Sequence, residues 1–226
     1  MFQGFTQQTS EFLWDLSFNN ERPWFQAHRE TFEEVLNQPF RELAKEVFAL
    51  MRQRWEERDF QIHVSRIYRD ARRLFGRGPY KDHLWFSVQS GDWRSLAPTF
   101  WFEIGAATYS CGMGFWGATP AQMEAYRRQI DANPARFERL VRELNECGGF
   151  RLWGEEYKRP KADRGELLNP WYNRKYVSVG WERDFGGDAL SAQLPQIILD
   201  TYEKLMPLFD YFEEFFRAAG DTETRA

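Results

Sequence analysis

Basic side chains gather in one short stretch of a chain that is acidic overall. Between residues 62 and 88 only two acidic residues, Asp70 and Asp82, oppose a set of arginines and one lysine: Arg66, Arg69, Arg72, Arg73, Arg77 and Lys81. The formal net charge of the whole chain is −4. Guanidinium forks suit paired oxygens, and a lysine adds a point charge. The stretch therefore predicts a site for an anion that carries phosphate or carboxylate groups.

We expect part of this stretch to form one ligand site together with basic residues from later in the chain. The turn GRGPYK, residues 76–81, sets a tight backbone course and places an aromatic ring and an ammonium group just after the bend. Asp70 would orient the arginines by accepting their hydrogen bonds. The predicted ligand-binding residues are Arg66, Arg69, Asp70, Tyr80, Lys81, Arg127, Lys158 and Arg159.

Two structural interpretations of the same residues stay open. Arg66, Arg69 and Asp70 could form an ion-pair network that ties a strand to a helix, because an unpaired buried charge is costly. The charges could instead be scattered over a solvated surface. Either interpretation would remove the ligand pocket.

No motif specifies a reaction. The sequence contains no Walker-type phosphate loop, no HExxH and no GxSxG. An enzyme acting on a phosphate ester or a nucleotide, with the same cations as electrostatic stabilisers, is the alternative hypothesis. Acid–base chemistry by Asp70 and Tyr80, or by His63 and His83 near an aspartate, is conceivable. The pattern identifies no catalytic residue and no cofactor, and it predicts no metal site.

Single-stranded nucleic acid is a further candidate partner, because Tyr80 and the tryptophans could stack on bases. A pI near 5.6 argues against a dedicated DNA-coating protein, which is normally basic. Nucleic acid is therefore not the favoured partner. The sequence does not indicate an oligomeric state.

Three features indicate a cytoplasmic protein without a membrane association. The two cysteines, Cys111 and Cys147, match no metal-ligand spacing and fit a reducing compartment. The first residues, MFQGFTQQTSEFLWDL, lack the basic head and apolar run of a secretion signal. No stretch reaches the roughly 18 apolar residues that a membrane span needs.

Hydrophobic periodicity predicts strands in the middle of the chain and helices around them. The helical patterns cover residues 9–19, 20–38, 40–51, 119–132, 133–147 and 190–216. The alternating patterns, which are typical of strands, cover residues 60–69, 84–88, 99–105 and 108–116. Residues 150–184 are expected to be irregular and are again locally basic, with lysines and arginines interleaved with tyrosines and a tryptophan.

These elements predict one α+β domain over residues 1–226. Sequential strands with short loops favour an antiparallel sheet, built mainly from residues 60–116. The N-terminal, middle and C-terminal helices would cover it, and the chain would fray from about residue 220. Phe, Trp and Tyr make up 18% of the residues, so the core should consist largely of rings.

Several motifs resemble a known family. They are FLWDLSFNNERPWF, RIYRDARRLFGRGPYKDH, GMGFW with the following TPAQMEAYRRQI, and YKRPKADR. Together they resemble the domain-of-unknown-function family 2461 of bacteria and fungi over nearly the whole chain, which implies a single domain and no particular substrate. The matching positions are Asn19, Asn20, Trp24, Phe25, Arg66, Arg69, Asp70, Tyr80, Lys81, Gly114, Arg127, Lys158 and Arg159. One departure is that Arg73 and Leu74 stand where such proteins tend to have an aromatic residue.

Overall fold

The computed structural model describes residues 1–70, 72, 74, 76–91 and 96–217, together with the backbone of 218–223. The fold class is α+β, as predicted. The chain divides into two compact units. The first unit comprises residues 1–88, 101–111 and 182–200. The second comprises residues 89–100, 112–181 and 201–226.

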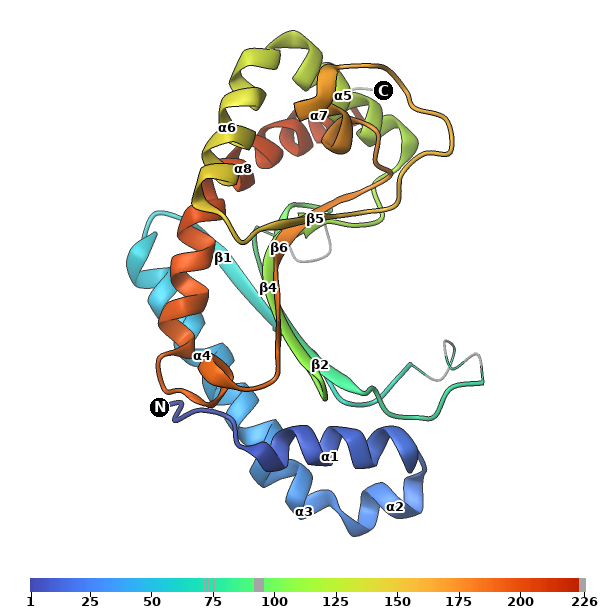
Figure 1. The fold of residues 1–226 in the computed structure, drawn as a ribbon, viewed down its shortest axis with the longest axis vertical. Helices are drawn as coiled ribbons and strands as arrows, with labels where there is room; N and C mark the ends of the chain where they lie inside the picture. Colours follow the sequence, from blue (N-terminus) through green and yellow to red (C-terminus); the bar gives the residue numbers. More distant parts are fainter. Residues whose placement is uncertain (71, 73, 75, 92–95, 224–226) are drawn as a thin grey trace. The chain divides into compact units, whose positions relative to one another are not determined.

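The described strands form one antiparallel sheet in the order β1-β2-β3-β4-β6-β5 (Figure 1). The strands are β1 (Phe60–Val64), β2 (His83–Ser90), β3 (Thr99–Gly105), β4 (Thr108–Phe115), β5 (Arg151–Trp153) and β6 (Val177–Asp184). The helices are α1 (Gln7–Phe18), α2 (Arg22–Ala27), α3 (Arg29–Phe32), the π-helix η1 (Glu33–Asn37), α4 (Gln38–Arg54), α5 (Pro120–Ala132), α6 (Pro134–Cys147), α7 (Gly165–Tyr172), the 3-10 helix η3 (Gly187–Leu190) and α8 (Leu194–Glu223).

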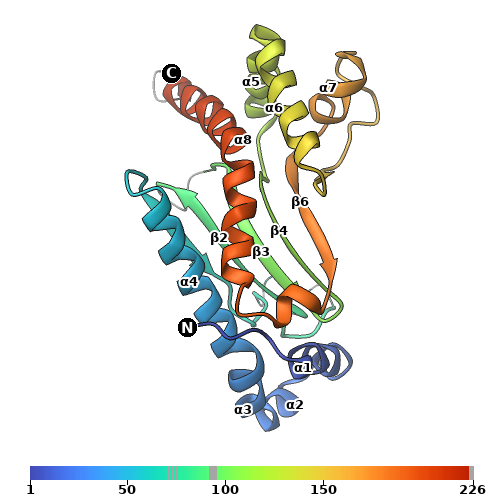
Figure 2. The ribbon, with the colours of Figure 1, turned by 60° about the vertical axis from the view of Figure 1, so that its left-hand side comes forward.

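Aromatic rings form the core of the first unit. The ring of Phe40 in α4 lies 5.8 Å from that of Phe86 in β2 and 6.4 Å from that of Phe102 in β3, between ring centroids. All three side chains are fully buried. Burial alternates along β2 and β3, so that one face of these strands packs into the core and the other is half-exposed. Figure 2 shows α4 beside these strands.

The second unit has its own aromatic core. Phe115 of β4 lies within 5.8 Å, between ring centroids, of Tyr126 in α5 and of Phe212, Phe215 and Phe216 in α8. All four contacts are edge-to-face, an arrangement that the ring quadrupoles favour. This core holds α5 and the C-terminal part of α8 against the sheet.

The prediction that residues 150–184 are irregular was wrong. The segment contains β5, α7 and β6, and the register of β5 pairs Arg151 with Gly180. The first five residues of β6, Val-Ser-Val-Gly-Trp, are all buried, so this part of the strand is covered on both faces. Pro170 lies inside α7, where a proline normally argues against a helix. The proline therefore concealed α7, whereas the short alternation at the start of β6 was a strand signal that the prediction missed.

The other predicted elements are confirmed with shifted ends, except that residues 20–38 form α2, α3 and the π-helix η1 in place of one helix. The hairpin of β3 and β4 turns between Gly105 and Thr108, as the small residues there suggested. Thr119 and Asn133 cap α5 and α6 by accepting backbone hydrogen bonds. The last helix continues through Glu223, past the point near residue 220 where fraying was expected, and residues 224–226 lie outside the described part. None of the described helices combines the length and apolar character needed to cross a membrane.

Candidate anion-binding site

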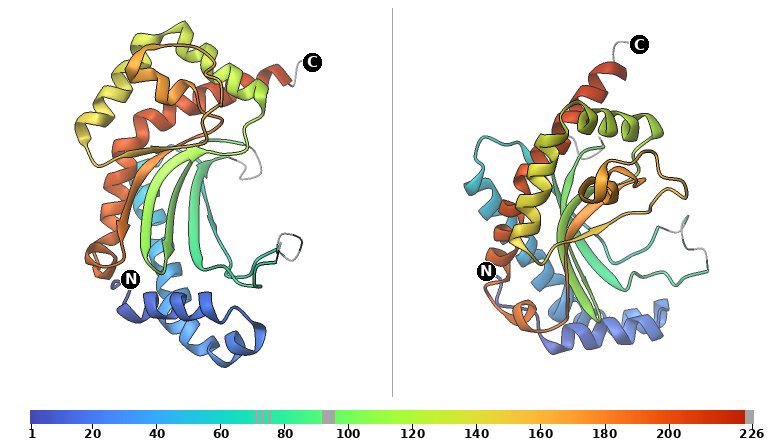
Figure 3. Two further views of the ribbon diagram at one scale, coloured as in Figure 1. Left: turned by 45° about the vertical axis from the view of Figure 1, so that its right-hand side comes forward. Right: turned by 45° about the horizontal axis from the view of Figure 1, so that its top comes forward.

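Residues 65–82, here called the arm, connect β1 to β2 and carry the predicted site (Figure 3). The two sides of the arm are joined by backbone hydrogen bonds. The amide of Arg69 donates to the carbonyl of Pro79 at 2.8 Å, and the amide of Lys81 donates to the carbonyl of Ile67 at 2.7 Å. Between them Tyr68 and Tyr80 form an isolated antiparallel bridge. This short ladder places Arg69 and Lys81 on adjacent segments of backbone.

Asn20, from the turn between α1 and α2, fastens the arm. Its side-chain amide donates to the carbonyl of Tyr80 at 2.9 Å, and its side-chain oxygen accepts from the amide of Tyr80 at 2.9 Å. The contact requires glycine at position 78, since a Cβ there would stand 2.3 Å from both Cγ and Oδ1 of Asn20. A pair of hydrogen bonds thus fixes the backbone that carries the predicted site.

The cationic groups of Arg69 and Lys81 are held by backbone carbonyls. The Nε of Arg69 donates to the carbonyl of Tyr80 at 2.8 Å, and the Nζ of Lys81 donates to the carbonyl of Arg66 at 2.6 Å. The side chain of Arg69 is 14% exposed. Burial, followed by the charge of Arg69, lowers the pKa of Lys81 below its ordinary value. The carbonyls orient both groups but do not neutralise them.

The carboxylate that contacts Arg69 is Asp82, which sequence proximity did not suggest. Its Oδ1 lies 3.4 Å from Nη2 of Arg69, a long contact, and 2.9 Å from Nδ1 of His83. The expected partner, Asp70, instead accepts three hydrogen bonds from Arg72. The side chain of Asp82 is 55% exposed, so solvent screens its pairing with Arg69.

The remaining arginines of the arm take other positions. Arg66 is exposed, and its backbone carbonyl accepts from Nζ of Lys81. Arg77 is exposed as well. Arg73, the site of the departure from the family pattern, lies outside the described residues. Of the predicted first-unit ligand residues, the structure therefore places Arg69 and Lys81 close together and leaves Arg66 in solvent.

The ring of Tyr80 belongs to the core. It is 3% exposed and stacks on Phe25 at 4.1 Å between ring centroids. Burial raises the pKa of its hydroxyl. Its carbonyl, by contrast, contacts both Asn20 and Arg69. The ring near the cationic groups is instead that of Trp85, whose centroid lies 5.8 Å from Nζ of Lys81.

Beside these cations a histidine lies between two carboxylates. The Nε2 of His83 is 4.0 Å from Oε2 of Glu103, and its Nδ1 contacts Asp82. Burial raises the pKa of Glu103, whereas the charge of His83 lowers it. The charges of Asp82 and Glu182 raise this pKa further. The arrangement could transfer a proton, so the enzyme hypothesis stays a prediction. His63, the other histidine considered, lies against Trp85 at 5.3 Å between ring centroids.

Metal ligation finds no support in the part of the chain that the structure describes. There, no three histidine, cysteine, aspartate or glutamate side chains gather in a way that could hold an ion.

The other three predicted ligand residues belong to the second unit. Lys158 and Arg159 are exposed on the loop between β5 and α7. Arg127 in α5 is only 9% exposed, and its guanidinium lies 5.6 Å from the ring centroid of Tyr157. Arg174, which the sequence reasoning missed, is also nearly buried, with a side chain that is 13% exposed.

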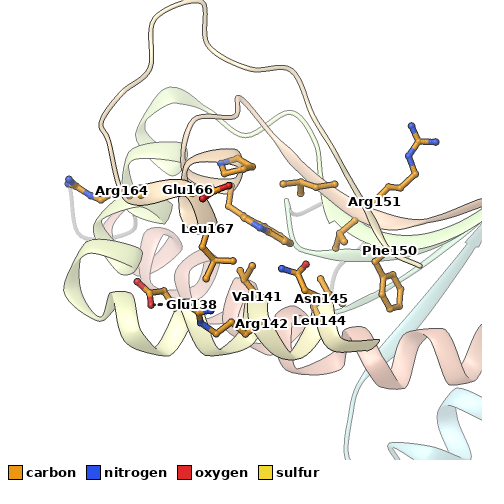
Figure 4. A pocket seen from close by; sticks show the side chains of 15 residues that line it. Glu138, Val141, Arg142, Leu144, Asn145, Phe150, Arg151, Arg164, Glu166 and Leu167 are labelled. Atoms are coloured by element: carbon orange, nitrogen blue, oxygen red, sulfur yellow. Dashed lines mark ion pairs between the residues drawn. The ribbon is translucent and has the colours of Figure 1, made fainter. Parts of the chain in front are cut away.

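A pocket of about 730 Å³ lies between α6, α7 and β5 in the second unit (Figure 4). Apolar side chains such as Val141 and Leu167 line it, together with charged residues. Two of its arginines are paired, Arg142 with Glu138 at 3.9 Å and Arg164 with Asp131 at 2.7 Å. None of the predicted ligand residues lines this pocket, and paired charges do not favour an anion there.

One comparison with known proteins matches the chain to a protein family. The model of the family described as conserved hypothetical protein (DUF2461) matches residues 8–211, which include all the predicted ligand residues. No curated protein matches the chain.

Proposed function

We propose a function for this chain, which belongs to the DUF2461 family of conserved hypothetical proteins. It is a cytoplasmic protein that binds a small ligand bearing phosphate or carboxylate groups. The ligand would bind at Arg69 and Lys81, with exposed Arg66 as an additional cation. The conclusion follows from charge and geometry, because the description of the family names no activity.

The observation that carries the proposal is the way in which Arg69 and Lys81 are held. Both groups donate to backbone carbonyls, which align them without removing their positive charge. The carboxylate that contacts Arg69, on Asp82, is half-exposed and shared with His83. Two like charges brought together in a partly buried place repel each other, and an anion between them would relieve this repulsion. Each group also keeps N–H donors that its carbonyl does not use.

Arg69→Ala is expected to abolish the stabilisation of the protein by anions. A ligand at a hundred times its Kd stabilises a folded protein by about 2.7 kcal/mol, and this corresponds to roughly 5–10 °C in Tm for a chain of this size. The measurement is a thermal-shift screen of the wild type and the variant with inorganic phosphate, nucleoside monophosphates and small carboxylates. We expect the shift in the wild type alone.

Arg72→Ala is the matched control, because Arg72 lies on the same arm, is 88% exposed and pairs with Asp70. It should respond to anions as the wild type does. If Arg69→Ala lowers Tm strongly and no anion shifts the wild type, the arm holds a structural ion-pair network and the proposal is wrong. A Kd that weakens steeply with added salt and needs an oligonucleotide would instead favour single-stranded nucleic acid.

Anion affinity should fall as the pH rises into the alkaline range, before ordinary lysines lose their charge. The pKa of Lys81 is lowered, so its ammonium form is lost at a lower pH than in an exposed lysine. The anion requires that form, and above the pKa the affinity should fall by up to about tenfold per pH unit. Calorimetry with sulfate, whose own charge is constant there, measures the effect. Lys81→Met should bind weakly at every pH, and a flat profile in the wild type would contradict the assignment.

A further inference from the structure

The second unit contains a buried cation that lacks a hydrogen-bond acceptor. Arg127 is 9% exposed, and within the described residues its Nη1 atom has no hydrogen-bond partner. Buried guanidinium groups are normally paired, because removing an unpaired charge from water costs several kcal/mol. An aromatic ring, that of Tyr157, covers the group at 5.6 Å. A ring face attracts a cation but accepts no conventional hydrogen bond from Nη1.

Arg174 is a second nearly buried arginine of the same unit, and it too has a donor without an acceptor in the described part of the chain. Its Nη1 donates to the carbonyl of Gly154 and its Nη2 lies 3.1 Å from Glu156, but its buried Nε has no acceptor among the residues described. The charges of Arg127 and Arg174 both act on Tyr126, where they oppose the rise in pKa that burial produces. The two guanidinium groups also contact adjacent residues of one loop, because Arg174 pairs with Glu156 and Arg127 lies against the ring of Tyr157.

Carboxylates compensate these charges only in part. Glu156, which pairs with Arg174, has a side chain that is 64% exposed. Asp131 is close enough to Arg127 for the two charges to interact, but its oxygens accept from Nε of Arg164 at 2.7 Å and from the hydroxyl of Tyr172 at 2.8 Å. Positive charge thus remains in excess around the free Nη1 and Nε donors.

The loop over Arg127 is held in a defined position. The amide of Tyr157 donates to the carbonyl of Asn173 at 3.0 Å. The side chain of Asn173 accepts from the amide of Lys161 at 2.7 Å and donates to the carbonyl of Ala162 at 3.0 Å. The ammonium group of Lys161 lies 4.4 Å from the ring centroid of Tyr157, so that ring has cations from two elements beside it. Such anchoring favours a preformed site.

We propose that Arg127, Arg174 and Tyr157 form an oxyanion site in the second unit, and that it takes a phosphate or carboxylate group. The oxygens of the ligand accept from Nη1 of Arg127 and from Nε of Arg174, the two donors left without partners. Lys158 and Arg159, exposed on the same loop, add positive charge that attracts the ligand. The site uses second-unit residues alone and extends the proposed function to a second oxyanion.

Counting the bound phosphate tests this site and separates it from the one on the arm. Equilibrium dialysis with radiolabelled inorganic phosphate should show two bound equivalents on the wild type. Arg127→Met should lose one equivalent, or lower the affinity of that equivalent at least tenfold, and keep the one that Arg69→Ala removes. Arg128→Met is the matched control, because Arg128 is the next residue and its side chain is 67% exposed; it should bind as the wild type does.

Stability provides the second measurement. Without phosphate, Arg127→Met should melt no lower than the wild type, since the substitution removes an unpaired charge and keeps apolar volume. Arg127→Lys, which keeps the charge but loses the fork, should bind phosphate more weakly than the wild type. The inference is overturned if Arg127→Met melts well below the wild type while phosphate stoichiometry is unchanged, or if Arg127→Lys binds phosphate as the wild type does. It is overturned equally if Arg69→Ala removes all bound phosphate, and that result would leave the site on the arm in place.

Discussion

Gly114→Ala is expected to lower the free energy of unfolding by about 3 kcal/mol or more, within the range of severe core overpacking. Gly114 lies in β4, and a Cβ at this position would stand 2.5 Å from the carbonyl oxygen of Val177 and 2.7 Å from Cα of Ser178, both in β6. These are backbone atoms, so they can move away only if the strands separate. Urea denaturation followed by tryptophan fluorescence measures the loss.

Gly105→Ala is the matched control for this change. Gly105 ends β3, and a Cβ there would meet its nearest neighbour, the carbonyl oxygen of Thr108, at 3.5 Å, an ordinary contact. Its effect should stay within about 1 kcal/mol. Equal urea midpoints for Gly114→Ala and the wild type would show that β4 and β6 can tolerate a side chain between them.

The close approach of β4 and β6 also explains the glycine spacing there. Residues 112–117, GMGFWG, fit the spacing of a dinucleotide-binding fingerprint. That motif requires a turn from a parallel strand into a helix. Here Gly112 and Gly114 lie within a strand of an antiparallel sheet. At Gly114 the missing side chain makes room for a neighbouring strand.

Asn20→Asp should weaken anion binding by about tenfold or more and cost about 2 kcal/mol of stability. The aspartate loses the N–H group that donates to the carbonyl of Tyr80, and it places a charged oxygen opposite that carbonyl. The carbonyl keeps Nε of Arg69 as a donor, but losing one of two hydrogen bonds and facing a charged oxygen should together cost about 1–3 kcal/mol. The same carbonyl orients Nε of Arg69, so the change should also displace the cation that binds the ligand. Phosphate titration and urea denaturation of one preparation measure both effects.

Asn19→Asp controls for the added charge. Asn19 is the neighbouring residue and is exposed, and its side chain donates to the carbonyl of Asp15 within its own helix end. Its stability should change by no more than about 0.5 kcal/mol, and its phosphate affinity by less than a factor of three. If Asn20→Asp keeps the affinity of the wild type, Arg69 is oriented without help from Asn20.

Local pattern predicted most of the secondary structure because each signal depends on neighbouring residues. Alternation found β2 and β3, where one face is buried and the other half-exposed. A cap followed by proline marked the starts of α5 and α6. Pattern failed for β6, whose first residues are buried on both faces, and for α7, which contains a proline. The resemblance to the family is confirmed by the match over residues 8–211.

The sequence by itself determined where positive charge is concentrated, and it placed Arg127 in the apolar stripe of α5 beside Tyr126 and Ile130. The partners of these cations were decided only by the tertiary structure. Asp82 contacts Arg69 in place of Asp70, and Asn20 reaches across sixty positions of sequence to Tyr80. The reason is physical: charge and periodicity belong to neighbouring residues, whereas hydrogen-bond acceptors are supplied by whichever segments the packing brings together. That no described residue offers an acceptor to Nη1 of Arg127 is likewise a consequence of packing.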